Sequence, residues 1–335
     1  MIEPTAWLTI LGFKIYPFGC CLAAAMLLAL LLLFLTKSPL PRKALLSFAA
    51  WAVPCGLLGA RLGYFVLRAG NLLVDFGAGF IWRLDWGGFS LAGGFVGLLF
   101  AAWLAAKSAK RRMGEVLNAA APAMLLFVAL ERFAECLTTE GIGDYVENVL
   151  FQRFPFAVLD VYGDYRVAVF FWEGLTALLL AAALWLNLKR GRFQDTMLRG
   201  MLFFSATQIF WESLRRDNFL RFGFVRVNQL FAIALVLAAV GTLLVRGKQR
   251  RGVAVATLAG YSLGTLLLVA IEFGLDKSQI PNTILYAVMV VVLCAMMFGG
   301  GLLLRFANRN GGRTNEENLG DAVAHRMHAN GRCKG

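Results

Sequence analysis

The stretch LNAAAPAMLLFVALERFAEC (Leu117–Cys136) decides the fold class of this chain. Its first part, Leu117–Ala129, carries no charge, as expected of a helix that crosses the hydrocarbon core of a bilayer. Glu131, Arg132 and Glu135 then follow within five positions. An ionised side chain inside a membrane costs several kcal/mol, about 3 on insertion scales, unless it is paired or faces a polar cavity. The stretch therefore predicts a membrane helix with a functional polar end.

The composition extends this interpretation to the whole chain. Of 335 residues, 59% are hydrophobic and 16% are charged, whereas soluble domains carry about 45–50% apolar and about 25% charged residues. We expect an all-α polytopic membrane protein. The predicted spans are Pro17–Thr36, Ala44–Leu67, Phe89–Ala106, Glu115–Ala134, Val167–Asn187, Met197–Leu214, Val227–Val245, Val253–Phe273 and Thr283–Leu304.

The net charge of +13 is concentrated in alternate loops, a pattern that indicates membrane topology and not nucleic-acid binding. Basic loops alternate with mixed or acidic ones, and by the positive-inside rule the N-terminus is outside and the C-terminus cytoplasmic. The basic loops are Lys37–Lys43, Lys107–Arg112, Lys189–Arg199 and Arg246–Arg251. One outer loop, Arg215–Arg226, breaks the pattern with four arginines against one aspartate.

Residue types that hold metals are scarce. The six cysteines lie mostly inside apolar runs without metal-ligand spacing, and both histidines, His325 and His328, lie in the polar tail. We expect no metal and no cofactor. The first segment lacks a basic n-region, so no cleavable signal peptide is expected. The paired glycines Gly87–Gly88 and Gly93–Gly94 lack the Lys-Ser/Thr of a phosphate loop and predict close packing or loop turns.

The predicted topology places the ionisable residues of five helices or their caps at one depth, in the outer leaflet. They are Arg61, Arg132, Glu135, Arg166, Glu173, Glu212 and Arg215. We expect Arg61, Arg132, Arg166, Glu173, Glu212 and Arg215 to line one polar cavity open to that leaflet. The alternative is that each arginine reaches the headgroups by itself with a glutamate paired to it.

Six short strings around these charges resemble those of the prolipoprotein diacylglyceryl transferases, in the same order and on the expected helices. In ERFAECLTTEGIG, Arg132, Glu140 and Gly143 fall on the family's arginine, glutamate and final glycine. The other strings are LLGARLGYFVL (Leu57–Leu67), DWGGFSLAGGFVGL (Asp85–Leu98), RVAVFFWEG (Arg166–Gly174), TQIFWESLRRD (Thr207–Asp217) and VNQLFAI with Gln229. The resemblance covers about residues 16–245.

Four positions depart from the family's pattern. Ala92 stands where the family has a histidine and Phe18 where it has a tyrosine. Glu135 replaces an asparagine, and Gln208 replaces the arginine four residues before the sixth-helix glutamate.

The resemblance implies transfer of a diacylglyceryl group from phosphatidylglycerol to the lipobox cysteine of a preprolipoprotein, in the bacterial cell membrane. Buried arginines would stabilise the leaving phosphate by charge-assisted hydrogen bonds. It places Arg132, Glu140, Glu212 and Arg215 in the catalytic set, with Arg132 and Arg215 on the phosphate and Glu140 or Glu135 as general base. Substrate-binding residues would be Arg61, Glu135, Gly143, Arg166 and Glu173. The glutamates could instead merely neutralise the arginines.

The resemblance also implies a seven-helix transferase-like domain over residues 1–248. The apolar runs predict two additional membrane helices over 249–307, and the polar, Gly/Asn/Arg-rich composition of 308–335 predicts a disordered cytoplasmic tail. The partners that the resemblance implies would be phosphatidylglycerol, the signal peptides of preprolipoproteins and other membrane lipids. Two alternatives stay open. One is a family member that binds a phospholipid or lipoprotein precursor without this chemistry, and the other is an unrelated transporter whose strings match by chance.

Overall fold

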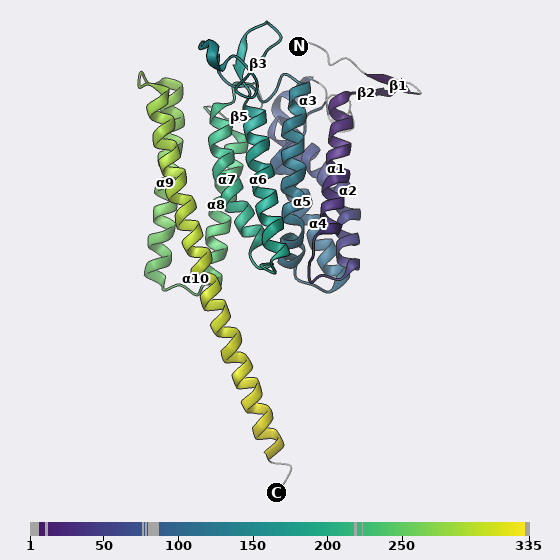
Figure 1. Ribbon diagram of the computed structural model, residues 1–335, viewed down its shortest axis with the longest axis vertical. Coiled ribbons are helices and arrows are strands. Elements are labelled where there is room, and N and C mark those ends of the chain that lie inside the picture. Colours follow the sequence, from purple (N-terminus) through teal and green to yellow (C-terminus); the bar gives the residue numbers. More distant parts are fainter. Residues whose placement is uncertain are drawn as a thin grey trace. The chain divides into compact units, whose positions relative to one another are not determined.

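The computed structural model describes residues 7–10, 13–75, 77, 79, 87–217, 220–222 and 224–331 (Figure 1). Asp85 and Trp86, which begin one of the recognised strings, lie outside these residues. Within them, the α-helices are α1 (Pro17–Leu35), α2 (Arg42–Leu67), α3 (Ala69–Asp75), α4 (Leu91–Ala109), α5 (Met113–Ala134), α6 (Val169–Lys189), α7 (Thr196–Leu214), α8 (Val227–Arg246), α9 (Arg251–Lys277) and α10 (Asn282–Gly331). Short two-stranded antiparallel sheets pair β1 (Leu8–Ile10) with β2 (Phe13–Ile15), β3 (Ala157–Leu159) with β4 (Tyr165–Val167), and β5 (Arg221–Phe222) with β6 (Val225–Arg226).

The chain is an all-helical, multi-pass membrane protein. Among the described residues, eight helices are long and apolar enough to cross a membrane: α1, α2, α4, α5 with its 3-10 extension to Leu137, α6, α8, α9 and the part of α10 up to Asn308. We expected nine spans. The remaining predicted span, Met197–Leu214, forms the 19-residue helix α7, but this helix is not among the eight. The physical reason is its polar content, since it buries Ser205, Gln208 and Glu212 against its neighbours.

Two compact units divide the chain, residues Met1–Ala232 and Ile233–Gly335, with the division inside α8. In the first unit, α5 packs against α1, α4, α6 and α7, and α2 packs against α4. In the second unit, α9 packs against α10, where the Tyr261 hydroxyl donates to the carbonyl oxygen of Met296 at 2.6 Å. The predicted domain boundary at 248 stays a prediction.

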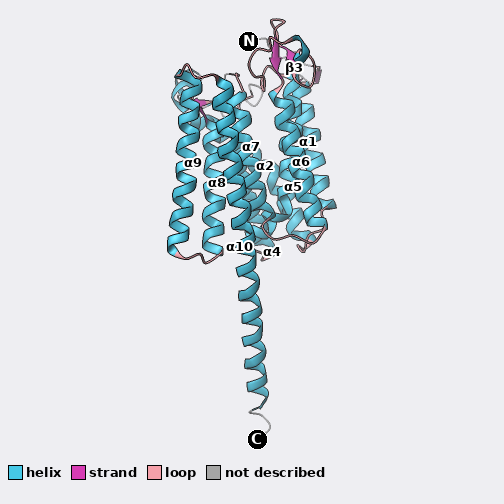
Figure 2. Cartoon of the chain, turned by 60° about the vertical axis from the view of Figure 1, so that its left-hand side comes forward, coloured by secondary structure: helices cyan, strands magenta, loops and turns pink. Residues whose placement is uncertain are grey.

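The helix α10 continues as one element from Asn282 to Gly331 (Figure 2). It passes through most of the segment that the composition predicts to be disordered. Residues beyond Asn308 lie outside the apolar span. The disorder of 308–335 stays a prediction.

Glycines set the contact between α2 and α4. Gly59 and Gly63 of α2 face Gly93 and Gly97 of α4, each pair spaced by four residues. A Cβ at Gly63 would lie 2.7 Å from the Cα of Gly93, and a Cβ at Gly97 would overlap the carbonyl oxygen of Cys55. Small residues let membrane helices approach until their backbones touch. The close-packing role predicted for Gly93 is confirmed.

A segment outside the spans joins α5 to α6, and we call residues 138–168 the cap. It contains the 3-10 turn η4 (Val149–Phe151) and the β3–β4 hairpin, and Tyr145 bridges Arg166 on the other edge of β4. Figure 2 shows β3 beyond the ends of the helices α5 and α6. The cap therefore stands next to the charged end of α5.

Candidate functional site

The charged end of α5 lies in a buried polar cluster built from four helices. Arg132 and Glu135 come from the end of α5, Glu173 from the first turns of α6, and Gln208 and Glu212 from α7. Arg215, Asp217, Arg226 and Asn228 come from the segment that follows α7 and the first turn of α8. None of these nine residues is more than 9% exposed, so their charges interact at low dielectric.

Two arginines share two glutamates at the centre of the cluster. Arg132 donates to Glu135, and its Nε lies 2.6 Å from Oε1 of Glu173. Arg215 reaches the same two residues, with distances of 2.9 Å to Glu135 and 3.1 Å to Glu173. Because both guanidinium groups bind both carboxylates, the four side chains form a closed square of alternating charge.

Asp217 and Arg226 extend this square. Arg215 Nε donates to Asp217 at 2.9 Å, and Arg226 Nη1 donates to the other oxygen of Asp217 at 2.7 Å. Arg226 also donates to the carbonyl oxygens of Arg215 and Asp217, each at 2.8 Å. The β5–β6 hairpin, which returns the chain toward α7, is what brings Arg226 back to the cluster.

Gln208 and Asn228 supply amide groups around Glu212. The Gln208 side-chain amide donates to Glu173 at 2.7 Å and to Glu212 at 3.0 Å. Asn228 donates to the same oxygen of Glu212 at 2.7 Å. The carbonyl oxygens of both amide side chains and Oε2 of Glu135 are buried without a hydrogen-bond partner among the residues that the structure describes. The cluster is thus rich in acceptors.

Carboxyl groups outnumber guanidinium groups in the cluster. Three guanidinium groups (Arg132, Arg215 and Arg226) face four buried carboxyl groups (Glu135, Glu173, Glu212 and Asp217). Glu131 adds a fifth carboxyl group 3.6 Å from Arg132, with its side chain 23% exposed. An arginine at position 208 and an asparagine at 135, as in the family's strings, would shift this balance toward positive charge. The two replacements therefore make the site more acidic than the pattern that it resembles.

A short backbone segment near the start of the cap is hydrogen-bonded to the cluster. The N–H of Gly141 donates to Asp217 Oδ2 at 2.9 Å, and the N–H of Arg216 donates to the carbonyl of Ile142 at 2.9 Å. The N–H of Gly143 donates to the carbonyl of Val167 at 2.8 Å. Gly141 has φ +73°, and a Cβ there would overlap Glu135 Oε2. We call Gly141–Gly143 the hub.

Of the predicted site residues, the structure brings Arg132, Glu135, Glu173, Glu212 and Arg215 into one network. The contacts described for Arg61 lie elsewhere: its guanidinium donates to the carbonyls of Gly87 and Gly88, two loop glycines with positive φ. Arg166 donates to the carbonyl of Gly143 at 2.8 Å and stacks 4.1 Å from the Tyr145 ring. Arg61 and Arg166 thus donate to loop carbonyls, and the single cavity lined by all six residues stays a prediction.

Glu140 lies in the loop that enters the hub. More than a third of the residue is exposed, yet partial desolvation of its carboxyl group and the nearby Glu135 raise its pKa above the ordinary value, against the lowering effect of Arg215. Gly143 packs its Cα against Val167, Val169 and the carbonyl of Leu214, without room for a side chain. Its described role is therefore packing and backbone hydrogen bonding.

Asp217, Arg226 and Asn228 were not predicted as site residues. Asp217 and Arg226 lie in Arg215–Arg226, the one loop that broke the alternation of basic and acidic loops. Two of its four arginines, Arg215 and Arg226, are buried and paired inside the protein. The unexpected positive charge of a loop that the sequence predicts to be outside was the signal that could have found them.

Comparison with known proteins decides the family. The sequence profile of prolipoprotein diacylglyceryl transferases matches residues 5–245. The chain belongs to this family. It is 27% identical over 234 residues to the phosphatidylglycerol–prolipoprotein diacylglyceryl transferase of Streptococcus pneumoniae serotype 4, which covers 65% of this chain and 85% of that protein.

Other relatives agree with this membership. Identity is 28% over 248 residues to the transferase of that name from Bacillus cereus, covering 71% of this chain and 90% of the relative. It is 23% over 255 residues to that of Halalkalibacterium halodurans, covering 71% and 86%. As a member of the prolipoprotein diacylglyceryl transferase family, the chain is not an unrelated transporter with strings that match by chance.

The charge of Asp217 gives a testable pH dependence. Burial alone would raise the pKa of its carboxyl group, but Arg215, Arg226 and the Gly141 N–H hold that pKa well below its ordinary value of 3.8. A carboxyl group with a lowered pKa stabilises the folded state above the ordinary pKa, and this contribution is lost as pH falls through the folded value. We expect Asp217→Asn to lower the melting temperature near neutral pH, and the difference from the unmodified protein to shrink below about pH 4.

The control for this measurement is Asp144→Asn. Asp144 makes an exposed pair with Arg216 at 3.4 Å, and exposed pairs contribute about 0–1 kcal/mol. A melting difference for Asp217→Asn that stays constant on acidification would contradict the assignment of a charged, paired Asp217.

Proposed function

We propose that this chain transfers a diacylglyceryl group from phosphatidylglycerol to the cysteine thiol of a preprolipoprotein. One observation carries the proposal. Arg132 and Arg215, two arginines of the recognised strings, converge in one buried cluster beside the loop that holds Glu140. The names of the relatives support the choice of lipid and acceptor.

The chemistry required is displacement at a glycerol carbon. The thiol loses its proton to a base, the sulfur forms a bond to carbon, and the C–O bond breaks so that glycerol phosphate leaves with the electron pair. Guanidinium groups in a water-excluded site stabilise the charge that develops on the leaving phosphate. In this proposal, Arg132 and Arg215 exchange a carboxylate partner for a phosphate oxygen when the lipid enters.

Glu140 is the proposed base. A carboxyl group with a raised pKa accepts a proton more readily near neutral pH than an ordinary one. Its position also suits the role, since Glu140 directly precedes Gly141, which is bonded to Asp217 of the cluster. Ala92 leaves the chain without the histidine of the family's string, so a carboxylate has to take this step. Glu212 belongs to the proposed catalytic set because it falls on the glutamate of the family's sixth-helix string. Its carboxylate accepts hydrogen bonds from Gln208 and Asn228.

A second candidate function is lipid or precursor binding without transfer. Gln208 in place of an arginine and the excess of carboxyl groups favour it, because both reduce the attraction of the cluster for phosphate. Purified full-length protein in phosphatidylglycerol liposomes, incubated with a cysteine-containing precursor, separates the two functions. A product heavier by a diacylglyceryl group supports transfer, and binding without product supports the second function.

We further propose that the N-terminus is outside and the C-terminus cytoplasmic. The alternating basic loops support this orientation. Alkaline phosphatase, which is active only after export, should be inactive when fused after Gly335 and active when fused after Asp164 of the cap. An active fusion after Gly335 would reverse the proposed orientation.

A further inference from the structure

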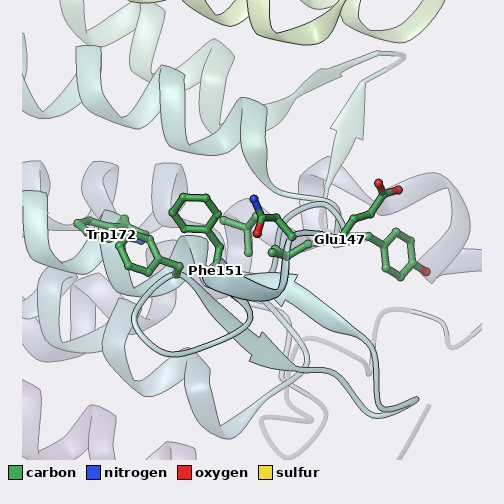
Figure 3. A pocket seen from close by; sticks show the side chains of 8 residues that line it. Glu147, Phe151 and Trp172 are labelled. Atoms are coloured by element: carbon green, nitrogen blue, oxygen red, sulfur yellow. The ribbon is translucent and has the colours of Figure 1, made fainter.

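A pocket lies between the cap and the first turn of α6, and none of the nine residues of the buried cluster lines it. It has a volume of about 370 Å³. Its lining residues are Tyr145, Val146, Glu147, Asn148, Phe151, Phe156, Val167 and Trp172. In Figure 3, Phe151 and Trp172 lie on one side of this space and Glu147 on the other. We call it the cap pocket.

The walls of the cap pocket are aromatic and its rim is acidic. Phe151 meets Phe156 edge to face at 5.4 Å between ring centroids, and Phe156 lies 5.9 Å from Trp172. Phe151 is nevertheless 47% exposed, which leaves apolar surface in contact with water. Glu147 is an exposed carboxylate, and no lining residue is basic. Arg166 stacks on the ring of the lining residue Tyr145, but its guanidinium also lies 4.0 Å from the Asp160 carboxylate. The pocket therefore fits an apolar group that has a positive charge beside it.

The cap pocket is also close to the buried cluster. Trp172 lines the pocket, and the next residue in α6, Glu173, binds Arg132 and Arg215. Val167, another lining residue, accepts a hydrogen bond from Gly143 of the hub. A ligand in the pocket would thus lie next to the site at which lipid chemistry is proposed.

Charge argues against a lipid surface as the occupant. The cap carries five carboxylates (Glu140, Asp144, Glu147, Asp160 and Asp164) and two arginines (Arg153 and Arg166). An acidic segment is repelled by the negative surface potential of anionic lipids, which attracts basic segments instead. A polypeptide with a basic residue has the complementary charge.

We propose that the cap pocket binds the acceptor polypeptide, taking one large apolar side chain and pairing Glu147 with a neighbouring basic residue. That this polypeptide is the acceptor rests on the proposed transfer. That the ligand has an apolar side chain beside a basic residue rests on the lining of the pocket alone. Aromatic anchors that fill pockets carry much of the energy of protein interfaces. In this proposal, the apolar side chain of the polypeptide packs against Phe151, and Glu147 favours a basic residue beside it.

Binding of a synthetic peptide to the full-length protein in neutral-lipid nanodiscs tests this proposal without any turnover. The peptide holds a cysteine between a leucine and a lysine, and a second peptide has glutamate in place of the lysine. Phe151→Ala should weaken binding of the lysine peptide about tenfold, as the loss of a good anchor does. Glu147→Lys should weaken the lysine peptide and strengthen the glutamate peptide.

Tyr162→Ala is the matched control. Tyr162 is an aromatic residue of the same cap, 88% exposed, and is not among the lining residues, so this variant should bind both peptides normally. Unchanged peptide binding by Phe151→Ala, or equal losses in Phe151→Ala and Tyr162→Ala, would overturn the pocket. The proposal would also be overturned if Phe151→Ala bound the peptides normally but bound phosphatidylglycerol less well, because that result would indicate a lipid occupant.

Turnover measured in parallel keeps the two proposals apart. Peptide binding that depends on Phe151 and Glu147, without transfer by the unmodified protein, overturns the proposed function and keeps the pocket. Transfer at limiting peptide that is unaffected by Phe151→Ala overturns the pocket and keeps the proposed function.

Discussion

Arg132→Gln should lower diacylglyceryl transfer by at least about a hundredfold, the usual cost of removing one group that stabilises a developing oxyanion. Arg132 lies at the centre of the cluster, bound to Glu135 and Glu173. Arg132→Lys should also be strongly impaired. It keeps the charge but loses the planar fork that binds two oxygens at once. The measurement is the rate of product formation by purified protein in phosphatidylglycerol liposomes, followed by mass spectrometry.

Stability has to be separated from catalysis in this experiment. Leaving a buried charge without its partner costs about 3–5 kcal/mol, and Arg132→Gln removes one partner of two glutamates. The double variant Arg132→Gln with Glu135→Gln removes the charge of both members of one pair and should restore accumulation, but not transfer. Arg216→Gln is the surface control, because Arg216 forms a partly exposed ion pair with Asp144 and is not one of the nine residues of the cluster. Transfer by Arg132→Gln at the unmodified rate would end the phosphate assignment.

Gly93→Ala should lower the amount of protein in the membrane several-fold or more, whereas Gly94→Ala next to it should have almost no effect. A Cβ at Gly93 would overlap the carbonyl oxygen of Gly59 and lie 2.8 Å from the Cα of Gly63. Both are backbone atoms of α2, so neither can move without separating the helices. A Cβ at Gly94 would meet the Cβ of Ala60 at 3.5 Å, which is an ordinary contact.

The magnitude follows from the cost of overpacking. Forcing extra volume into a well-packed interface costs about 1–3 kcal/mol and more where backbone is involved. Losses of this size change cellular abundance several-fold. The amount of each variant in isolated membranes, and its melting temperature in detergent, check the prediction. Similar values for both alanine variants would show that α2 and α4 do not touch at Gly59 and Gly93.

The sequence predicted the helices well because a membrane imposes a simple pattern. Uncharged runs such as Leu117–Ala129 are long enough to span, and α5 begins within two residues of the predicted Glu115 and ends at the predicted Ala134. The helix α7 shows where that pattern is weaker. Its apolar run was recognised, but the polar side chains that it turns to the cluster leave it outside the set of eight apolar spans.

The site was predictable only where its residues lie on helices. Arg132, Glu135, Glu173, Glu212 and Arg215 could be placed at one depth from helix direction alone. Asp217 and Arg226 could not, because their burial depends on a hairpin that folds the chain back over the end of α7. Arg61 and Arg166 were predicted at the same depth as these residues, and their described partners include loop carbonyls. Depth does not tell which way a side chain points.

The hub gives the two proposed ligands a common thermodynamic link. Asp217 is bonded on one side to the arginines of the cluster and on the other to the Gly141 N–H, and Gly143 is bonded to the strand that lines the cap pocket. A lipid phosphate that draws Arg215 away from Asp217 would also change the hydrogen bond between Asp217 and the Gly141 N–H of the cap. Linkage is reciprocal, so whatever factor the lipid applies to the affinity for the polypeptide, the polypeptide applies to the affinity for the lipid. Each of the two substrates would then act as an effector of the other.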